Sequence, residues 1–212
     1  MQRLRVKFSR GEDLKFLSHL DLIRLWERAF RRASFDLAYS EGFTPHARIS
    51  LAAPLQVGVT AQAELMDLWL AGWISPHTFM DSAQSQLPAA LKLLDIEIVS
   101  LDSPSLQSLV RFAEYTVEVE SEKNVEQVKA AIDYLLRTDS YPWHHTRDRE
   151  ERRYDLRKLI DNIWLMSLQG LAFRLGMKLR CDTGGSGRPE QVVKALGFSG
   201  QPLSIERVGL IF

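Results

Sequence analysis

The chain has 212 residues, of which 45% are apolar and 25% charged, as is typical of a globular protein with a core of its own. Its single cysteine, Cys181, excludes an internal disulfide framework, and one thiol cannot by itself hold an iron–sulfur cluster or a cysteine zinc site. No apolar segment approaches the length of a membrane span, and the N-terminus lacks the apolar core of a signal peptide. We therefore expect a cytoplasmic protein without a membrane role.

The formal net charge of zero hides an uneven distribution of charge. Basic residues outnumber acidic ones by 10 to 6 over 1–53 and by 12 to 8 over 146–212. Acidic residues outnumber basic ones by 6 to 1 over 54–110 and by 7 to 4 over 111–145. If the fold brings the two ends together, one face is cationic. Random scatter of surface charge explains the same counts equally well.

The first half of the chain reads as a compact α+β unit. Strict alternation over 2–9 predicts a strand whose outer face carries Arg3, Arg5 and Lys7. Ser18 then caps a helix that runs to about Ala33. The remaining predicted elements are a strand at 47–53, a strand or short helix at 62–71, a helix from Pro76 to before Pro88, and a strand at 93–101. This order is that of the ferredoxin-like unit.

The second half repeats this pattern loosely after a turn at 102–105. The predicted elements are a strand at 112–120, a helix at 124–137, a hairpin or a strand with a short turn within 144–160, a strand at 168–180, a helix from Pro189 to Gly197, and a strand at 204–212. We therefore predict an α+β protein made of two tandem ferredoxin-like units, 1–102 and 106–212. The second unit is expected to be irregular and to pack on the first.

The first helix carries a basic stripe of Arg24, Arg28 and Arg31, with Arg32 beside it. The planar fork of a guanidinium suits the recognition of phosphate, so the stripe is a candidate anion-binding surface. Glu27 can pair with Arg31 across one turn, which would use part of this charge internally. An ordinary solvated helix face is the alternative reading.

The loop that follows this helix holds several groups suited to contacting a ligand. They are Tyr39, Ser40, Gly42, Phe43, His46 and Arg48. The glycine would allow a close approach of the backbone to a ligand, or it serves a turn that requires a positive φ. His46 and His19 are weak candidates for a general acid–base. Local hydrogen bonding is the alternative for His46, and anion or backbone binding for His19.

A second candidate anion site lies late in the chain. Gly185, Gly187 and Arg188 precede the helix begun by Pro189, and free N–H groups at a helix start attract anions. A merely flexible loop is the alternative. Arg157 and Asp155 form a polar pair that is either a structural ion pair or part of a site. We find no metal-ligand pattern, no catalytic triad and no paired carboxylates.

Three early segments, RLRVKFSR, FLSHLDLIRLWERAFRRA and LAYSEGFTPHARISLAAPLQVGV, resemble the radical-SAM-linked protein family, a bacterial family of unknown function. The later DLRKLI and GGSGRPEQVVKALG are also similar to that family. The resemblance implies a radical-SAM partner that uses S-adenosylmethionine and an iron–sulfur cluster, and a link to RNA modification or translation. Without a three-cysteine motif, this chain resembles the accessory module, with no cofactor of its own.

These observations lead to one main hypothesis about function. We expect an accessory module that binds RNA, either tRNA or rRNA, and works with a radical-SAM partner without catalysing a reaction alone. A protein–protein adaptor with no nucleic-acid role is the alternative. A less favoured alternative is an enzyme that cleaves or modifies RNA through His19 or His46.

Overall fold

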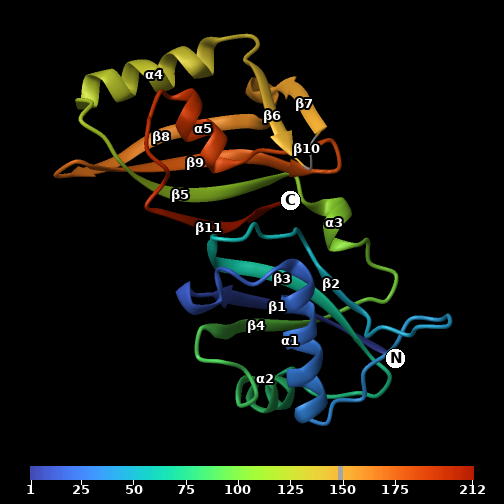
Figure 1. The fold of residues 1–212 in the computed structure, drawn as a ribbon. Helices are drawn as coiled ribbons and strands as arrows, with labels where there is room; N and C mark the ends of the chain where they lie inside the picture. The colour runs from blue at the N-terminus through green and yellow to red at the C-terminus, as the bar shows by residue number, and fades with distance from the viewer. Residues whose placement is uncertain (148–149) are drawn as a thin grey trace. The chain divides into compact units, whose positions relative to one another are not determined.

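The structure is a computed structural model that describes residues 1–147 and 150–212, with side chains described outside 145–150 (Figure 1). It is a mixed α+β fold that divides into two units, Met1–Val110 and Arg111–Phe212. The short helix α3 (Leu106–Leu109) belongs to the first unit, so the division comes later than the turn at 102–105. No helix in the described part of the chain is long and apolar enough to cross a membrane.

The first unit contains one sheet and two main helices. Its elements are β1 (Gln2–Arg10), the 3-10 helix η1 (Glu12–Leu14), α1 (His19–Arg32), β2 (Ile49–Leu51), β3 (Thr60–Leu70), α2 (Pro76–Gln84), β4 (Leu91–Val99) and α3. The strand order is β4-β1-β3-β2, and all neighbours are antiparallel. The segment 62–71, left open between strand and helix, is therefore the strand β3.

Helix α1 is fixed at its start by a cap and along its length by aromatic packing. The Ser18 side chain accepts a hydrogen bond from the Asp21 N–H at 3.2 Å, as the sequence predicts. Trp26 packs with ring centroids 5.0 Å from Phe8 of β1 and 5.3 Å from Phe30 one turn on. This packing holds the apolar stripe of α1 on the sheet, and the charged face of the helix is left towards solvent.

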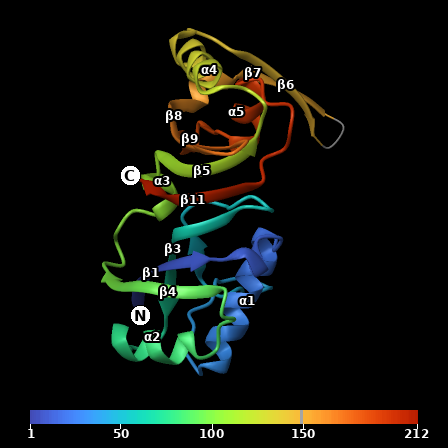
Figure 2. The ribbon, with the colours of Figure 1, turned by 90° about the vertical axis from the view of Figure 1, so that its left-hand side faces the viewer.

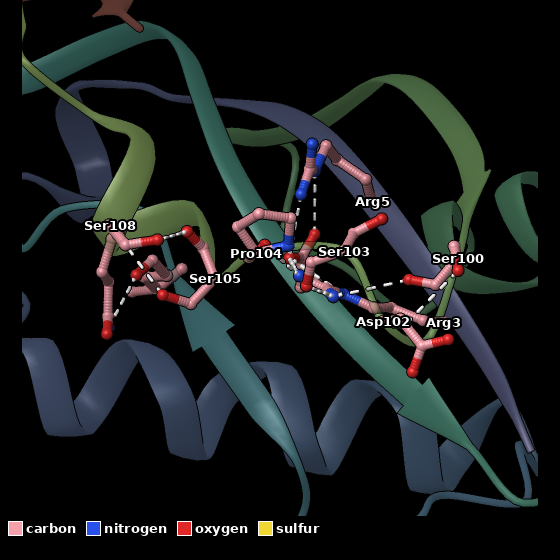
Figure 3. Close-up of polar contacts among 11 residues, drawn as sticks. Arg3, Arg5, Ser100, Asp102, Ser103, Pro104, Ser105 and Ser108 are labelled. Atoms are coloured by element: carbon pink, nitrogen blue, oxygen red, sulfur yellow. Dashed lines mark hydrogen bonds and ion pairs between the residues drawn. The ribbon is translucent and has the colours of Figure 1, made fainter.

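The outer face of β1 differs from the prediction that Arg3 and Arg5 face solvent. Arg3 is only 2% exposed, and its guanidinium donates to the Asp67 carboxylate, to Ser103 O at 2.6 Å and to Pro104 O at 2.9 Å (Figure 3). Arg5 donates to the same carboxylate at 3.0 Å. Two arginines thus share one buried aspartate beneath the segment 100–108. Only Lys7 of the three basic side chains is exposed.

The second unit has the same order of elements with insertions. Its elements are β5 (Phe112–Glu120), α4 (Val125–Arg137), β6 (Pro142–Arg147), β7 (Glu150–Asp155), the 3-10 helix η2 (Leu156–Leu159), β8 (Ile160–Gln169), β9 (Ala172–Asp182), β10 (Gly185–Ser186), α5 (Pro189–Ala195) and β11 (Ser204–Ile211). The strand order is β11-β5-β9, and β8 and β10 pair with different parts of β9. The hairpin β6–β7 extends away from this sheet (Figure 2).

The prediction of one strand over 168–180 is wrong. Gly170 adopts φ +61 and turns the chain between β8 and β9, which pair with each other. The polar stretch 144–160 contains most of the hairpin β6–β7, which was one of the two readings left open, and ends at the first residue of β8.

Candidate functional site

Helix α1 and the segment 85–88 border an open groove of about 620 Å³ in the first unit. The groove is lined by Leu17, Asp21, Arg24, Leu25, Arg28, Arg32, Ser85, Gln86, Leu87 and Pro88. Its three arginines follow one another every four residues along α1, so the Cα atoms of successive arginines are about 6 Å apart along the helix axis. Local sequence places the arginines on one helix face, and the fold supplies the opposite wall.

The three groove arginines differ in what holds them. The Arg32 guanidinium donates to Gln86 O at 2.6 Å, and Arg24 lies 3.5 Å from the Asp21 carboxylate. Within the described residues, Arg28 makes no hydrogen bond and no ion pair. Its guanidinium, exposed and unpaired, is the group in this groove most available to an external anion.

One carboxylate lies beside these cations. The Ser18 hydroxyl donates to Asp21 at 2.6 Å, and this bond, followed by the Arg24 charge, holds the pKa of Asp21 below its ordinary value. Asp21 is therefore ionised at neutral pH and balances part of the charge of Arg24. The remaining positive charge is concentrated at Arg28 and Arg32.

Arg31, predicted in the same stripe, lies outside the groove. It forms an ion pair with Glu27 at 2.6 Å and donates to the Tyr39 hydroxyl at 3.3 Å. The bond to Tyr39, followed by the charge of Glu27, raises the pKa of Arg31. The pairing with Glu27 that the sequence left open is thus present, and Arg32 takes the place expected of Arg31.

The loop 39–47 is closed at its base by the backbone. Tyr39 and Ala47 form a β-bridge, and the Ser40 N–H donates to His46 O at 2.9 Å. The Ser40 hydroxyl accepts from the His46 N–H at 3.0 Å, so this hydroxyl shapes the loop. Gly42 at the tip has φ +124, which favours glycine. Phe43, next to it, is fully exposed.

Arg48 is held against the ring of Trp69, which is not among the residues that the sequence predicts for the site. Its guanidinium lies 4.9 Å from the ring centroid of Trp69, and the Arg3 guanidinium lies 4.9 Å from the same centroid. Asp67 and Trp69 lie two residues apart on β3, so their side chains share one face of the sheet. The strand register places Arg3 on that same face. The two-residue spacing of Asp67 and Trp69 places both on one face if 62–71 is a strand, but the weak alternation of that segment does not decide between strand and helix.

Within the residues that the structure describes, the two histidine candidates lack the partners of a general acid–base. Both His19 and His46 are exposed. In the described part of the chain, neither imidazole hydrogen-bonds to a carboxylate or to another titratable side chain. The described residues also contain no cluster of three His, Cys, Asp or Glu side chains that could hold a metal.

In the second unit, Arg157 has a structural position. Its guanidinium donates twice to Leu136 O, at 3.2 and 3.0 Å, and once to Ile160 O. It thereby satisfies a carbonyl at the end of α4. The Asp155 carboxylate accepts from the Arg157 backbone N–H at 3.0 Å, so the two residues meet through the backbone.

The late glycine loop is shaped by packing. A Cβ at Gly187 would lie 2.8 Å from Leu159 O, and Gly185 adopts φ +154 with its Cβ position 2.7 Å from a Leu159 methyl group. Arg188 is the N-cap residue of α5, and its side chain makes no capping bond. Helix α5 has only seven residues, so it offers little dipole for an anion.

Comparison with solved structures shows a likeness in fold. A chain in the crystal structure of a Cbf5-Nop10-Gar1 complex is 9% identical, with a TM-score of 0.52, covering 99% of this chain and 48% of that one. A chain of the archaeal box H/ACA sRNP Nop10-Cbf5 complex is 8% identical (TM-score 0.49, coverage 99% and 47%). A chain of an H/ACA RNP bound to a substrate RNA containing 2'-deoxyuridine is 9% identical (TM-score 0.48, coverage 99% and 47%). This chain thus spans about half the length of those it matches.

The family is shown by the sequence itself. No curated protein matches the chain at a significant level. A family model, described as uncharacterized protein conserved in bacteria (DUF2344), matches residues 3–189, which is most of the chain. The protein therefore belongs to this bacterial family.

Proposed function

We propose that the protein binds RNA through the arginine groove of α1 and acts as an accessory module. The observation that carries the proposal is the exposed Arg28, which has no partner in the described residues and lies between Arg24 and Arg32 in one groove. Because the Arg28 guanidinium makes no internal contact among the described residues, it can donate to a phosphate without breaking one. The exchange of counterions for the arginine then favours binding to a polyanion.

The groove combines charge with an apolar wall, which suits a single strand of RNA. Leu25 lies on the α1 side, and Leu87 and Pro88 lie on the opposite side. An unpaired strand presents sugars and bases as well as phosphates, so apolar and cationic side chains can contact it together. A small free anion would use only the arginines.

The loop 39–47 lies beside α1 outside the groove, and in this proposal it supplies a separate contact. The hydrogen bond from Arg31 to the Tyr39 hydroxyl ties the loop to the helix. Phe43 and His46 are exposed on the same loop, and Arg48 follows it. Aromatic rings stack on unpaired bases, so this loop supplies stacking groups beside the phosphate contacts.

The proposed partner and cellular role rest on the family resemblance, and the proposed fold of each unit rests on its strand order. We propose a radical-SAM protein as the partner that supplies the chemistry, with tRNA or rRNA as the substrate, in the cytoplasm. The strand orders β4-β1-β3-β2 and β11-β5-β9-β8 support the reading of the chain as two ferredoxin-like units. In this proposal the chain holds no cofactor and contributes binding alone.

A protein–protein adaptor is the second candidate. Leu20 in the first turn of α1 and Phe16, just before the Ser18 cap, are both exposed, and Val57 is exposed as well. Exposed apolar groups at one helix end favour contact with another protein. Pull-down of the radical-SAM partner from nuclease-treated lysate, by a protein without RNA affinity, supports this alternative and contradicts the first.

The test is a salt titration of RNA affinity. We would measure the fluorescence anisotropy of a labelled single-stranded RNA with the wild type, Arg28→Gln and Lys129→Gln. Lys129 is an exposed helix cation outside the groove and serves as the matched control. The logarithm of the binding constant falls with the logarithm of the salt concentration, and loss of one phosphate contact makes this slope shallower by about 0.7 for single-stranded RNA. We expect that change for Arg28→Gln alone.

Two results would overturn the proposal. One is the absence of salt-dependent RNA affinity in the wild type, with or without its partner. The other is an equal slope for Arg28→Gln, Lys129→Gln and the wild type.

A further inference from the structure

The outer face of the sheet in the second unit carries an exposed aromatic residue. Residues alternate along β5 and β9, and the odd-numbered ones from Ala113 to Val119 and from Phe173 to Leu179 are buried. Helices α4 and α5 also bury apolar side chains in this core. The even-numbered side chains of both strands therefore form the other face. Trp164 of the neighbouring strand β8 lies on it.

Trp164 occupies a position on this face that a glycine makes possible. Trp164 and Gly176 are partners in the β8–β9 ladder. A Cβ on Gly176 would lie 2.0 Å from Cε2 and 2.3 Å from Nε1 of the indole. The ring therefore rests directly over the Gly176 backbone, and the side chain is still 37% exposed. The glycine holds the indole against the sheet while part of it remains accessible.

A second apolar side chain extends this surface. Met166 is 47% exposed, and its sulfur lies 4.0 Å from the Thr116 hydroxyl oxygen. Thr116 is the β5 partner of Gly176, so Met166 reaches across the sheet beside Trp164. Together Trp164 and Met166 make a continuous apolar platform within one unit.

Cations flank the platform along β9. Arg174 and Lys178 lie two residues to either side of Gly176 and so share its face. Lys178 is held by Asp161 at 3.0 Å. Arg174 is exposed and makes no hydrogen bond or ion pair among the described residues. It is the cation beside the indole that remains available.

The neighbouring carboxylate of Glu118 forms no ion pair with Arg174 among the described residues. Glu118 is the register partner of Arg174 on β5, but its carboxylate accepts from the Ser204 hydroxyl at 3.4 Å. Ser204 lies on β11, on the other side of β5 from Arg174. On this face Arg174 and Trp164 thus lie on β9 and β8, where Asp161 pairs with Lys178, and Glu118 lies on β5.

We propose that Trp164, Met166 and Arg174 form a base-binding subsite for single-stranded RNA. One unpaired base stacks on the Trp164 indole, and Arg174 contacts the adjacent phosphate. A paired base is enclosed in its own stack and cannot reach the ring, so the subsite selects unpaired RNA. The inference rests on the proposed function, since it names a second contact for the same substrate. The outer face of the sheet in the first unit offers no such platform, because Arg3 and Asp67 there are buried under 100–108.

The test compares binding to oligouridylate and to an abasic oligonucleotide with the same backbone. The variants are Trp164→Ala and Trp164→Phe, with Trp73→Ala as the matched control, since Trp73 is 75% exposed and lies in the first unit. We expect Trp164→Ala to weaken oligouridylate binding about 5- to 150-fold, the range of one base–aromatic stack. Trp164→Phe should retain most of the affinity, and Trp73→Ala all of it. Abasic affinity should be equal for the wild type and Trp164→Ala.

Three results would overturn the subsite. The first is equal oligouridylate affinity for Trp164→Ala and Trp73→Ala. The second is an equal loss on oligouridylate and on the abasic strand, which indicates a general disturbance of the fold. The third is that Trp164→Ala abolishes binding of the radical-SAM partner and leaves RNA affinity unchanged, which assigns this face to a protein contact. If the Arg28-dependent salt slope persists in any of these cases, the groove proposal stands and only the subsite fails.

Discussion

The buried carboxylate of Asp67 gives a direct test of how the first unit holds the segment 100–108. Asp67 is 1% exposed and accepts from both Arg3 and Arg5. The change Asp67→Asn keeps the shape of the side chain and one acceptor oxygen but removes the negative charge. Arg3 then remains buried with a positive charge that the Ser100, Ser103 and Pro104 carbonyl oxygens contact but that the Asp67 carboxylate no longer balances.

The expected cost follows from this geometry. Breaking a buried ion pair by removing one partner costs about 3–5 kcal/mol. The retained amide oxygen and the three carbonyl contacts of Arg3 place Asp67→Asn near the lower end, at about 3 kcal/mol. With a urea m-value of about 2 kcal/mol per molar, the unfolding midpoint of the first unit falls by about 1.5 M.

Urea unfolding followed by tryptophan fluorescence measures this shift, because three of the five tryptophans, Trp26, Trp69 and Trp73, lie in the first unit. Glu97→Gln is the control, since Glu97 is an exposed carboxylate and the β4 partner of Arg5. It should change the free energy of unfolding by less than about 0.5 kcal/mol. Hydrogen exchange in 100–108 should also quicken in Asp67→Asn. Equal midpoints for the two variants would refute the reasoning.

Three further changes test the second unit. Gly176→Ala would place a methyl group 2.0 Å from the Trp164 ring, so we expect a loss of about 1–3 kcal/mol and a shifted tryptophan emission; an unchanged emission contradicts this. Arg157→Ala leaves Leu136 O without its donor, and we expect about 1–3 kcal/mol lower stability with faster exchange at the end of α4; Arg157→Lys, which lacks the fork, should not restore it. Hydrogen bonds to Asp155, first of all from the Tyr141 N–H, lower the pKa of its carboxyl below 3.8. The ionised form therefore stabilises the fold above the unfolded pKa, and the difference in Tm between wild type and Asp155→Asn should vanish as the pH falls through the folded pKa; a constant difference contradicts this.

Elements with strong local signals were predictable from the sequence. The Ser18 cap, the apolar stripe through Trp26 and the proline at the start of α2 placed both helices of the first unit. These signals depend on neighbours within one or two turns. The segment 62–71 was less clear, because β3 buries side chains on both faces and its alternation is therefore weak.

The groove could be predicted only in part. Spacing along α1 indicated an arginine face, but the opposite wall comes from 85–88, more than fifty positions away from Arg32. The choice between Arg31 and Arg32 depends on Tyr39, whose position the loop decides. Likewise, alternation gives the face on which Arg3 lies, but only the fold shows that a distant segment covers that face.

Turns defined by a single residue were also hard to predict. Gly170 splits what looks like one alternating strand into β8 and β9. The sequence around it alternates on both sides, so periodicity continues through the turn. The position of Trp164 over the sheet was not predictable either, because it depends on Gly176 in the paired strand.

The central claim is that the groove arginines contact RNA phosphates. Its most direct test is the salt slope of single-stranded RNA affinity for wild type, Arg28→Gln, and the triple change of Arg24, Arg28 and Arg32 to Gln. If each arginine contacts one phosphate, the slope falls by about 0.7 in the single variant and by about 2 in the triple variant. A slope that stays at the wild-type value in the triple variant would contradict the account.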